Sequence, residues 1–265
     1  MNPTTNIAVR AARQAGNVLL RHHDRLDTLK VVEKQANDFV SEVDRAAEQA
    51  IINTIHKAYP DHGFLAEETG KHGGGDYQWV IDPLDGTTNY LHGLPQFSIS
   101  IALKYRGQLI TAVVYDPLRE ELFTAEKGNG AFLNDRRIRA TAHKGLGGAL
   151  LGTGIPFRDQ RHVDAYLGML KALIRDTAGI RRPGSAALDF AYVAAGRTDG
   201  FWELGLAPWD FAAGVLLVRE AGGVVTDLAG GERYFETGNV VAGGLRVHKE
   251  ILATIRPFLS QELPA

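Results

Sequence analysis

The strongest constraint on the fold is a run of short strand patterns in the middle of the chain, enclosed by helical patterns. The segments FSISIALKY and LITAVVYD alternate or run apolar, and the turn residues RGQ between them complete the signature of a β-hairpin. The segment ELFTAEKGNGAFLNDRRI continues in the same style. We therefore expect a sheet with antiparallel pairing between residues 97 and 138.

Helical patterns surround this sheet. Apolar residues recur at helical spacing over Ile7–His23 and Ser41–Tyr59, and Ser41 with Asp44 three positions later fits a capping box. After Ala149 the patterns alternate between strand and helix. The expected strands are 149–154, a short one near 180, 199–204, 224–227 and 239–244, and the expected helices are 162–175, 185–196, 209–223 and a final one. This layout predicts a mixed α/β, α+β-like fold.

Composition narrows the class of protein. The 265 residues contain no linker or repeat, so we expect a single domain over 1–265. A net charge of −2 argues against binding of nucleic acid or membrane surfaces through bulk positive charge. The absence of cysteine excludes disulfides and thiolate metal sites. With neither a signal-peptide pattern nor an apolar run of the ~20 residues that a membrane helix needs, the chain is expected to be soluble and cytoplasmic.

The segment WVIDPLDGTTNY places two acids at the end of an apolar strand. Asp82 and Asp85 flank Pro83, which stiffens the backbone between them. Two buried carboxylates repel each other, and a divalent cation held by hard oxygen ligands removes that cost, which favours Mg²⁺ or Mn²⁺. Gly86 and the polar residues from Thr87 onward suit a phosphate-binding turn at a helix start. The alternative interpretation is a turn followed by a helix cap.

Three further acids can also be interpreted either as metal ligands or as residues with a purely structural role. Glu67 directly follows an apolar strand in LAEETG, where the alternative is a solvated charge pair with Glu68. Asp210 in APWDFAAG begins an apolar helix, where aspartate is a common capping residue. Asp44 shares this ambiguity through its capping box. None of these acids decides the function alone, and their combination carries the hypothesis of a metal site.

At this point the chain resembles the inositol monophosphatase family. WVIDPLDGTTNY and PWDFAAG match its two signatures, and DFVSEVD, LAEETG, GTGIPF and RRPGSAALDFAYVAAGRTDGFWELGL extend the similarity over nearly the whole length. Within the family the chain is most similar to the bacterial extragenic-suppressor type. The resemblance implies the αβαβα layers of the inositol monophosphatase and fructose-1,6-bisphosphatase fold, and a homodimer.

The resemblance also assigns roles to individual residues. It implies two or three Mg²⁺ ions, with Mn²⁺ as a substitute. The first ion takes Glu67, Asp82 and the carbonyl of Leu84, and the second takes Asp82, Asp85 and Asp210. Asp44 and Thr87, with Glu67, fall at the family's catalytic positions, where the first two orient the attacking water. Substrate contacts are implied for Glu67, Leu84, Asp85, Gly86, Thr87, Arg181, Gly184, Ser185, Ala186, Glu203 and Asp210.

Two features leave the substrate open, because Ala207 stands where some animal members carry histidine and the loop Lys71–Asp76 is short. The implied reaction is hydrolysis of a small phosphate monoester, first of all inositol monophosphate, by direct in-line attack of a metal-activated water, with sensitivity to lithium. Alternative substrates are fructose 1,6-bisphosphate, a nucleotide 3′-phosphate and histidinol phosphate. A different class of function is that of a partner protein in transcription antitermination or ribosome maturation, with RNA or the transcription machinery. A metal-binding fold without activity is a third hypothesis, which the intact acid set disfavours.

Overall fold

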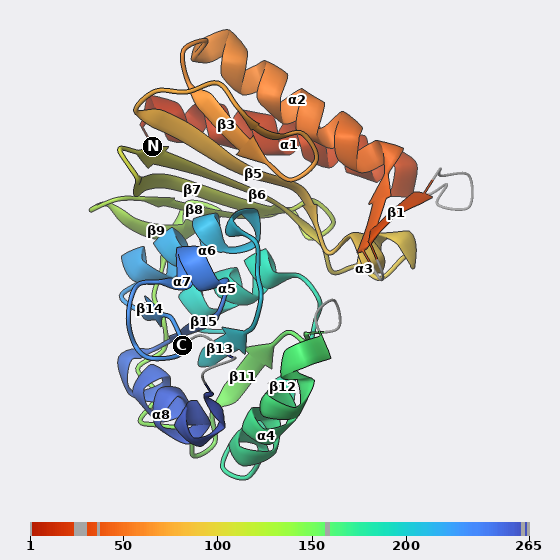
Figure 1. Cartoon of the computed structure of the whole chain (residues 1–265). Helices are drawn as coiled ribbons and strands as arrows, with labels where there is room; N and C mark the ends of the chain where they lie inside the picture. The colour runs from red at the N-terminus through yellow and green to blue at the C-terminus, as the bar shows by residue number, and fades with distance from the viewer. Residues whose placement is uncertain (1, 24–30, 36–37, 157–159, 261–262, 264–265) are drawn as a thin grey trace.

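Helices and sheets alternate in five layers (Figure 1). The computed structural model describes residues 2–23, 31–35, 38–156, 160–260 and 263. One helix pair covers the outer face of an eight-stranded sheet, a second pair fills the space between the two sheets, and a third covers a five-stranded sheet. In that order the pairs are α1 (Pro3–His23) with α2 (Glu42–Ala58), α5 (Ala186–Ala194) with α6 (Pro208–Glu220), and α4 (Val163–Ile174) with α8 (Leu245–Ile255). The expected αβαβα layers are confirmed.

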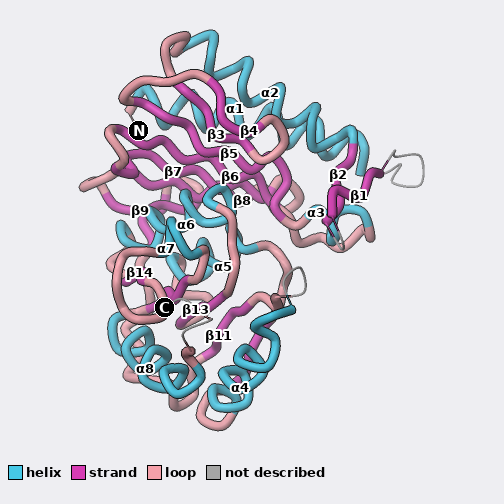
Figure 2. Tube along the Cα trace, in the orientation of Figure 1, coloured by secondary structure: helices cyan, strands magenta, loops and turns pink. Residues whose placement is uncertain are grey.

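The eight-stranded sheet contains the predicted hairpins (Figure 2). Its order is β10-β9-β8-β7-β6-β5-β3-β4, and every neighbouring pair is antiparallel except β3 with β5. The bounds are β3 (Gly63–Ala66), β4 (Gly70–His72), β5 (Tyr77–Asp85), β6 (Ser98–Tyr105), β7 (Gln108–Asp116), β8 (Glu121–Glu126), β9 (Gly130–Leu133) and β10 (Arg136–Ile138). β4 occupies part of the segment expected to be a loop, because the turn at residues 67–69 folds it back onto β3.

The five-stranded sheet is mixed, with the order β12-β11-β13-β15-β14. β11 pairs in parallel with β12 and β13, whereas β15 pairs antiparallel with β13 and β14. The strands are β11 (Leu150–Thr153), β12 (Gly179–Arg181), β13 (Gly200–Glu203), β14 (Val224–Thr226) and β15 (Val240–Gly243). All five lie where the sequence predicts strands.

The remaining elements are short. The helices are α3 (Thr87–Leu91), α7 (Tyr234–Thr237) and the 3₁₀ turns η2 (Gln160–His162) and η3 (Arg256–Phe258), and β1 (Val31–Gln35) pairs with β2 (Asp38–Ser41). The sequence analysis did not anticipate this β1–β2 ribbon. The side chain of Ser41 lies outside the described residues, so its capping role stays a prediction. Within the described part of the chain, no helix has the length and apolar character that crossing a membrane requires.

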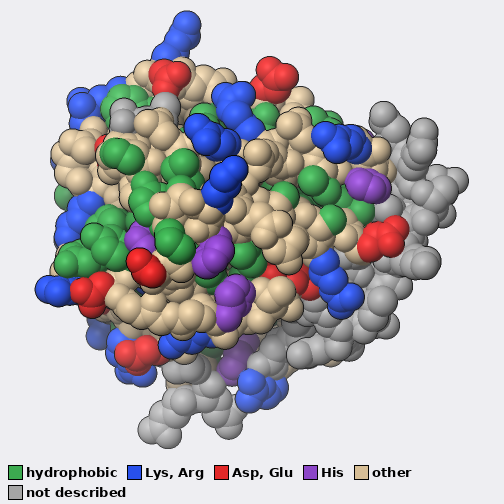
Figure 3. Space-filling model, turned by 90° about the horizontal axis from the view of Figure 1, so that it is seen from above, with side chains coloured by type: hydrophobic (Ala, Val, Ile, Leu, Met, Phe, Trp, Pro, Cys, Tyr) green, Lys and Arg blue, Asp and Glu red, His purple; other side chains and the backbone are tan. Residues whose placement is uncertain are grey.

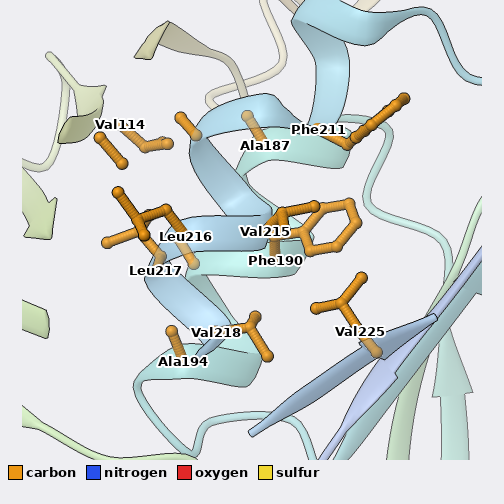
Figure 4. Packing of buried hydrophobic residues seen from close by; sticks show 14 of the residues in the cluster. Val114, Ala187, Phe190, Ala194, Phe211, Val215, Leu216, Leu217, Val218 and Val225 are labelled. Carbon is orange, nitrogen blue, oxygen red and sulfur yellow. The ribbon is translucent and has the colours of Figure 1, made fainter. Parts of the chain in front are cut away.

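The two helices between the sheets run side by side in the same direction (Figure 4). Ala187 and Phe211 lie near one end of the pair, and Ala194 and Val218 near the other. Gly214 permits this close approach, because a Cβ at that position would overlap the side chain of Phe190. Since both helices begin at the same side of the core, their N-terminal N–H groups face one region, which is where the acids of β5 lie.

Candidate active site

A cavity of about 730 Å³ opens at the carboxyl end of β5, between the N-terminal ends of α5 and α6. It brings together nearly all residues that the resemblance implicates, although they come from distant parts of the chain. Those lining it are Glu67, Asp82, Leu84, Asp85, Gly86, Thr87, Gly184, Ser185, Ala186, Glu203 and Asp210. The exceptions are Asp44 and Arg181.

A β-bulge places the two acids of β5 together. Asp85 stands three positions after Asp82 in the sequence, yet the residues that pair with them on β6, Ser98 and Ser100, are only two positions apart. In a regular strand, residues three positions apart point to opposite faces of the sheet. The extra residue in the bulge brings both aspartate side chains to the same face of the sheet. Bulges beside functional sites typically redirect side chains in this way.

Three carboxylates converge at this bulge. One oxygen from each of Asp82, Asp85 and Asp210 lies within 4.8 Å of the others. Burial raises the pKa of Asp82 well above its ordinary value, and the charges of Glu67, Asp85 and Asp210 raise it further. Glu67 lines the same cavity. Such concentrated negative charge is costly in a buried site unless a cation or protons neutralise it.

Asp85 also connects β5 to the start of α5. Its Oδ2 accepts hydrogen bonds from the Ser185 hydroxyl and from the backbone N–H of Ala187 at 2.8 Å, at the start of α5. Burial raises the pKa of Asp85 to about 6, although these hydrogen bonds lower it. The carboxylate is therefore held rigidly at a helix N-terminus, where negative charge is favoured.

Asp210 combines both interpretations offered by the sequence. Its Oδ2 accepts a hydrogen bond of 2.7 Å from the N–H of Ala207, which caps α6, while the same carboxylate belongs to the acid cluster. The capping bond fixes the orientation of the side chain, so the two roles support each other.

The donor set fits a hard divalent cation. Carboxylate oxygens are the ligands that Mg²⁺ and Mn²⁺ prefer, and they stand beside the carbonyl of Leu84, a residue that lines the cavity. That carbonyl accepts the Thr87 hydroxyl at 3.0 Å, and a second lone pair is available for a cation. The residues present are therefore suited to hold metal at this position.

Gly86 starts the turn that follows the bulge. Its φ is +95°, a conformation that side-chain-bearing residues rarely adopt. A Cβ there would lie 2.9 Å from the carbonyl oxygen of Gln96 and 3.2 Å from that of Gly184. The turn therefore needs glycine both for its backbone conformation and for its contact with the segment that precedes α5.

Gly86→Ala is expected to lower the free energy of unfolding by about 2 kcal/mol or more, from left-handed strain and the Cβ overlap. Urea denaturation measures the change. Gly147→Ala is the matched control, because a Cβ at that position meets nothing within 4 Å. A Gly86→Ala chain as stable as the control variant would show that the turn is not constrained as described.

Thr87 connects the turn to α2. Its hydroxyl lies 3.2 Å from Oδ1 of Asp44 and 3.0 Å from the carbonyl oxygen of Leu84, and it donates to these acceptors. Asp44 is fully buried, and Thr87 is the member of the pair that lines the cavity. The arrangement can orient a water molecule on Thr87 and relay its proton toward Asp44.

Gly154, Arg182 and Glu203 form another part of the cavity wall, which we call the Glu203 end. Gly154 lies directly against the Glu203 carboxylate, which a Cβ at Gly154 would overlap. The structure places Arg182 in the cavity wall, whereas Arg181, the last residue of β12, is exposed and donates to the carbonyl oxygen of Ile180. Successive side chains of an extended segment point to opposite sides, so only one of the two arginines faces the cavity. A contact between Arg181 and substrate stays a prediction.

The sequence analysis included Asn89 only among the polar residues of the phosphate-binding turn, and it missed Asp189. Asn89 donates to the carbonyl oxygens of Gln96 at 2.8 Å and Pro183 at 2.9 Å, and so ties the turn to the segment before α5. Asp189 lines the cavity from inside the apolar helix α5. A lone acid among apolar residues was the available signal for Asp189, whereas nothing local distinguishes Asn89 from an ordinary turn residue.

Comparisons with known proteins identify the family of this chain. The model of the inositol monophosphatase family matches residues 1–261. Nus factor SuhB of Pseudomonas aeruginosa is 55% identical over 269 residues, with 99% of each chain covered. The crystal structure of extragenic suppressor protein suhB from Bartonella henselae has a TM-score of 0.94 at 46% identity, covering 96% of this chain and 99% of that one. The IMPase of Thermotoga maritima has a TM-score of 0.87 at 38% identity, with 98% of each chain covered.

These relatives confirm both the predicted family and its extragenic-suppressor type. The chain belongs to the inositol monophosphatase family.

Proposed function

We propose that this chain is a Mg²⁺-dependent phosphatase that hydrolyses small phosphate monoesters, with inositol monophosphate as the first candidate substrate. The observation that carries the proposal is the convergence of Asp82, Asp85 and Asp210 within 4.8 Å beside a glycine-led turn. Family membership supports the same class of reaction. When bound, Mg²⁺ neutralises phosphoryl oxygens and lowers the pKa of a coordinated water.

The chain's own residues supply the remaining functions. Glu67, Asp82, Asp85 and Asp210, with the carbonyl of Leu84, are the proposed metal ligands. The backbone N–H groups of Gly86 and Thr87 hold the phosphate, and the Thr87 hydroxyl aims a water molecule at phosphorus in line with the ester bond. Thr87 passes the proton of that water toward Asp44, which accepts it, while the bond between phosphorus and the ester oxygen breaks and the alcohol leaves with a proton from solvent water.

The alcohol portion of the substrate occupies the Glu203 end. The Glu203 carboxylate accepts hydrogen bonds from hydroxyl groups, and the backbone of Gly184, Ser185 and Ala186 forms the adjoining wall. In this proposal the phosphate lies at the acid cluster and the alcohol lies against the Glu203 end.

Phosphate release from a panel of esters tests the proposal. The panel contains inositol monophosphate, fructose 1,6-bisphosphate, a nucleoside 3′-phosphate and histidinol phosphate at equal concentrations, each with Mg²⁺ or with EDTA. We expect release that requires Mg²⁺ and is fastest with inositol monophosphate. Faster release from another ester would keep the phosphatase class and change the substrate. No release from any ester would contradict the proposal.

The effect of Mg²⁺ on stability should depend on pH. Since burial raises the pKa of Asp82 and raises that of Asp85 to about 6, the folded chain binds more protons than the unfolded chain. Without metal, the contribution of these groups to stability is greatest below about pH 4 and is lost as the pH rises through the folded pKa values, by about 3 kcal/mol for Asp85 alone. Mg²⁺ competes with these protons, so its stabilising effect should grow as the pH rises.

We therefore expect Mg²⁺ to raise the melting temperature more at about pH 7.5 than at about pH 5. Scanning fluorimetry with and without Mg²⁺ at each pH measures the difference. Subtracting the melting temperature without Mg²⁺ from that with Mg²⁺ at the same pH cancels the stability contribution of groups outside the site. One such group is His248, whose pKa burial lowers to about 4. Equal Mg²⁺ shifts at both pH values would contradict the proposed ligands.

A role with the transcription machinery is the second candidate function, because the relative from Pseudomonas aeruginosa is named a Nus factor. On the face seen in Figure 3, basic and acidic side chains of described residues are interspersed, so charge alone does not favour an RNA there. Complementation of a strain that lacks the gene separates the two functions. Restoration of growth by an Asp82→Asn allele would favour the partner role, and failure would favour catalysis.

Four further expectations from the sequence stay predictions. They are the single-domain organisation, the cytoplasmic location, the homodimer and inhibition by lithium. Sedimentation measures the oligomeric state directly, and turnover with millimolar lithium measures the inhibition.

A further inference from the structure

Asp189 is the acid of this cavity that the proposed mechanism does not use. It lies in α5, four residues after Ser185, among side chains that are otherwise apolar. It is 2% exposed and still forms part of the cavity wall. Its position is therefore at the floor of the cavity.

One oxygen of the Asp189 carboxyl lacks a hydrogen-bond partner within the described residues. This oxygen, Oδ1, is buried. Burial raises the pKa of Asp189 well above its ordinary value, and the charges of Glu203 and Asp85 raise it further, while Arg182 lowers it. Asp189 therefore lies within the electrostatic influence of Asp85, Glu203 and Arg182.

The neighbouring backbone leaves room for this carboxyl. A Cβ at Gly152 would lie 3.2 Å from Oδ1 of Asp189, so the strand passes close beside it without supplying a donor. An unpartnered buried polar atom destabilises a folded chain unless a ligand satisfies it. The unpartnered carboxyl oxygen of Asp189 is able to accept a hydrogen bond from a hydroxyl group.

We propose that Asp189 is a further specificity-determining residue, whose carboxyl hydrogen-bonds a hydroxyl group of the substrate's alcohol portion at the floor of the Glu203 end. The inference rests on the proposed phosphatase function and extends it to the class of alcohol. A polyol satisfies Asp189, Glu203 and the adjoining backbone together, whereas an alcohol without further hydroxyls leaves the buried carboxyl unpaired.

Two esters of matched ring size test this role. Inositol monophosphate carries ring hydroxyls, and cyclohexyl phosphate lacks them. The readout is the ratio of kcat/KM for the two esters in wild type, in Asp189→Ala and in Asp189→Asn. We expect this ratio to fall about tenfold or more in Asp189→Ala and about threefold in Asp189→Asn, because the amide retains one donor and one acceptor. Loss of general stability would lower both rates and leave their ratio unchanged.

Asp227→Asn is the matched control, because Asp227 is equally buried but accepts N–H groups from Ala229, Gly231 and Arg233 and does not line the cavity. A ratio within about twofold of wild type in folded Asp189→Ala would overturn the inference. If that variant does not fold, an unchanged ratio in Asp189→Asn has the same meaning. A wild-type chain that hydrolyses neither ester would contradict the proposed function instead. The test of Asp189 would then compare the ratio of the dissociation constants of the two esters, measured by calorimetry, in wild type and variants.

Discussion

Asp82→Asn is expected to lower kcat/KM by about 10³-fold while leaving the chain folded. Asp82 stands at the centre of the acid cluster, and it is the residue proposed to serve both metal sites. An amide keeps the shape of the side chain but removes the negative charge that binds a hard cation. Loss of this shared ligand therefore weakens cation binding at both proposed metal sites. Initial rates over a range of Mg²⁺ concentrations measure the effect.

Stability separates this interpretation from misfolding. In the metal-free chain the Asp82 carboxyl is buried and repelled by Glu67, Asp85 and Asp210. Replacing it by a neutral amide removes this repulsion, so metal-free Asp82→Asn should melt at the wild-type temperature or above. Added Mg²⁺ should stabilise the variant much less than the wild type.

Asp116→Asn is the control for a buried acid in the same sheet. Oδ1 of Asp116 accepts the N–H groups of Leu118 and Arg119, and its carboxylate pairs with the Arg119 guanidinium. Asp116→Asn should lower the free energy of unfolding and leave the Mg²⁺ dependence of turnover unchanged. Asp82→Asn with near-normal turnover at saturating Mg²⁺ would refute the role given to Asp82.

Thr87→Val is expected to lower kcat by about 10²-fold to 10³-fold, with much smaller changes in KM and in the Mg²⁺ concentration needed for activity. Valine has the shape of threonine without the hydroxyl, so the turn retains its packing and its backbone N–H groups. The variant loses the group that contacts both Asp44 and the carbonyl of Leu84. Water would then no longer be aimed at phosphorus or connected to the buried carboxylate.

The coupling between the two side chains gives a stricter test. If Thr87 and Asp44 act as one unit, Thr87→Val combined with Asp44→Asn should be little slower than the slower single variant. Thr88→Val is the matched control, since Thr88 is the neighbouring, exposed hydroxyl of the same turn. Independent, multiplying losses in the double variant would contradict the proposed relay.

Local patterns predicted the elements of this fold better than the way they meet. The hairpins of residues 97–138 and the strand at Trp79 follow from alternation and apolar runs, which depend only on neighbouring residues. The β1–β2 ribbon and β4 could not be predicted this way, because the pairing of β4 depends on how the chain turns back onto β3. The register of β5 with β6 could not be predicted either, because a bulge is defined by the pairing of two strands and not by the sequence of one.

In the site, too, local sequence predicted individual residues better than the way they come together. Asp82 and Asp210 could each be identified as functional or capping residues from local sequence, but their convergence depends on the parallel packing of α5 and α6 between two sheets. Local sequence also could not decide which of Arg181 and Arg182 faces the cavity, because that depends on where β12 ends. Asp189 needed the structure too, since a lone acid in an apolar helix gains its meaning from the cavity beside it.

Anomalous diffraction from crystals soaked in Mn²⁺ tests the central claim most directly. We expect Mn²⁺ peaks in the cavity, with one ion held by Asp82, Asp85 and Asp210, whose oxygens already lie within 4.8 Å of one another, and another beside Glu67 and the carbonyl of Leu84. Crystals that show these carboxylates apart, or together with no cation among them at saturating Mn²⁺, would contradict the account.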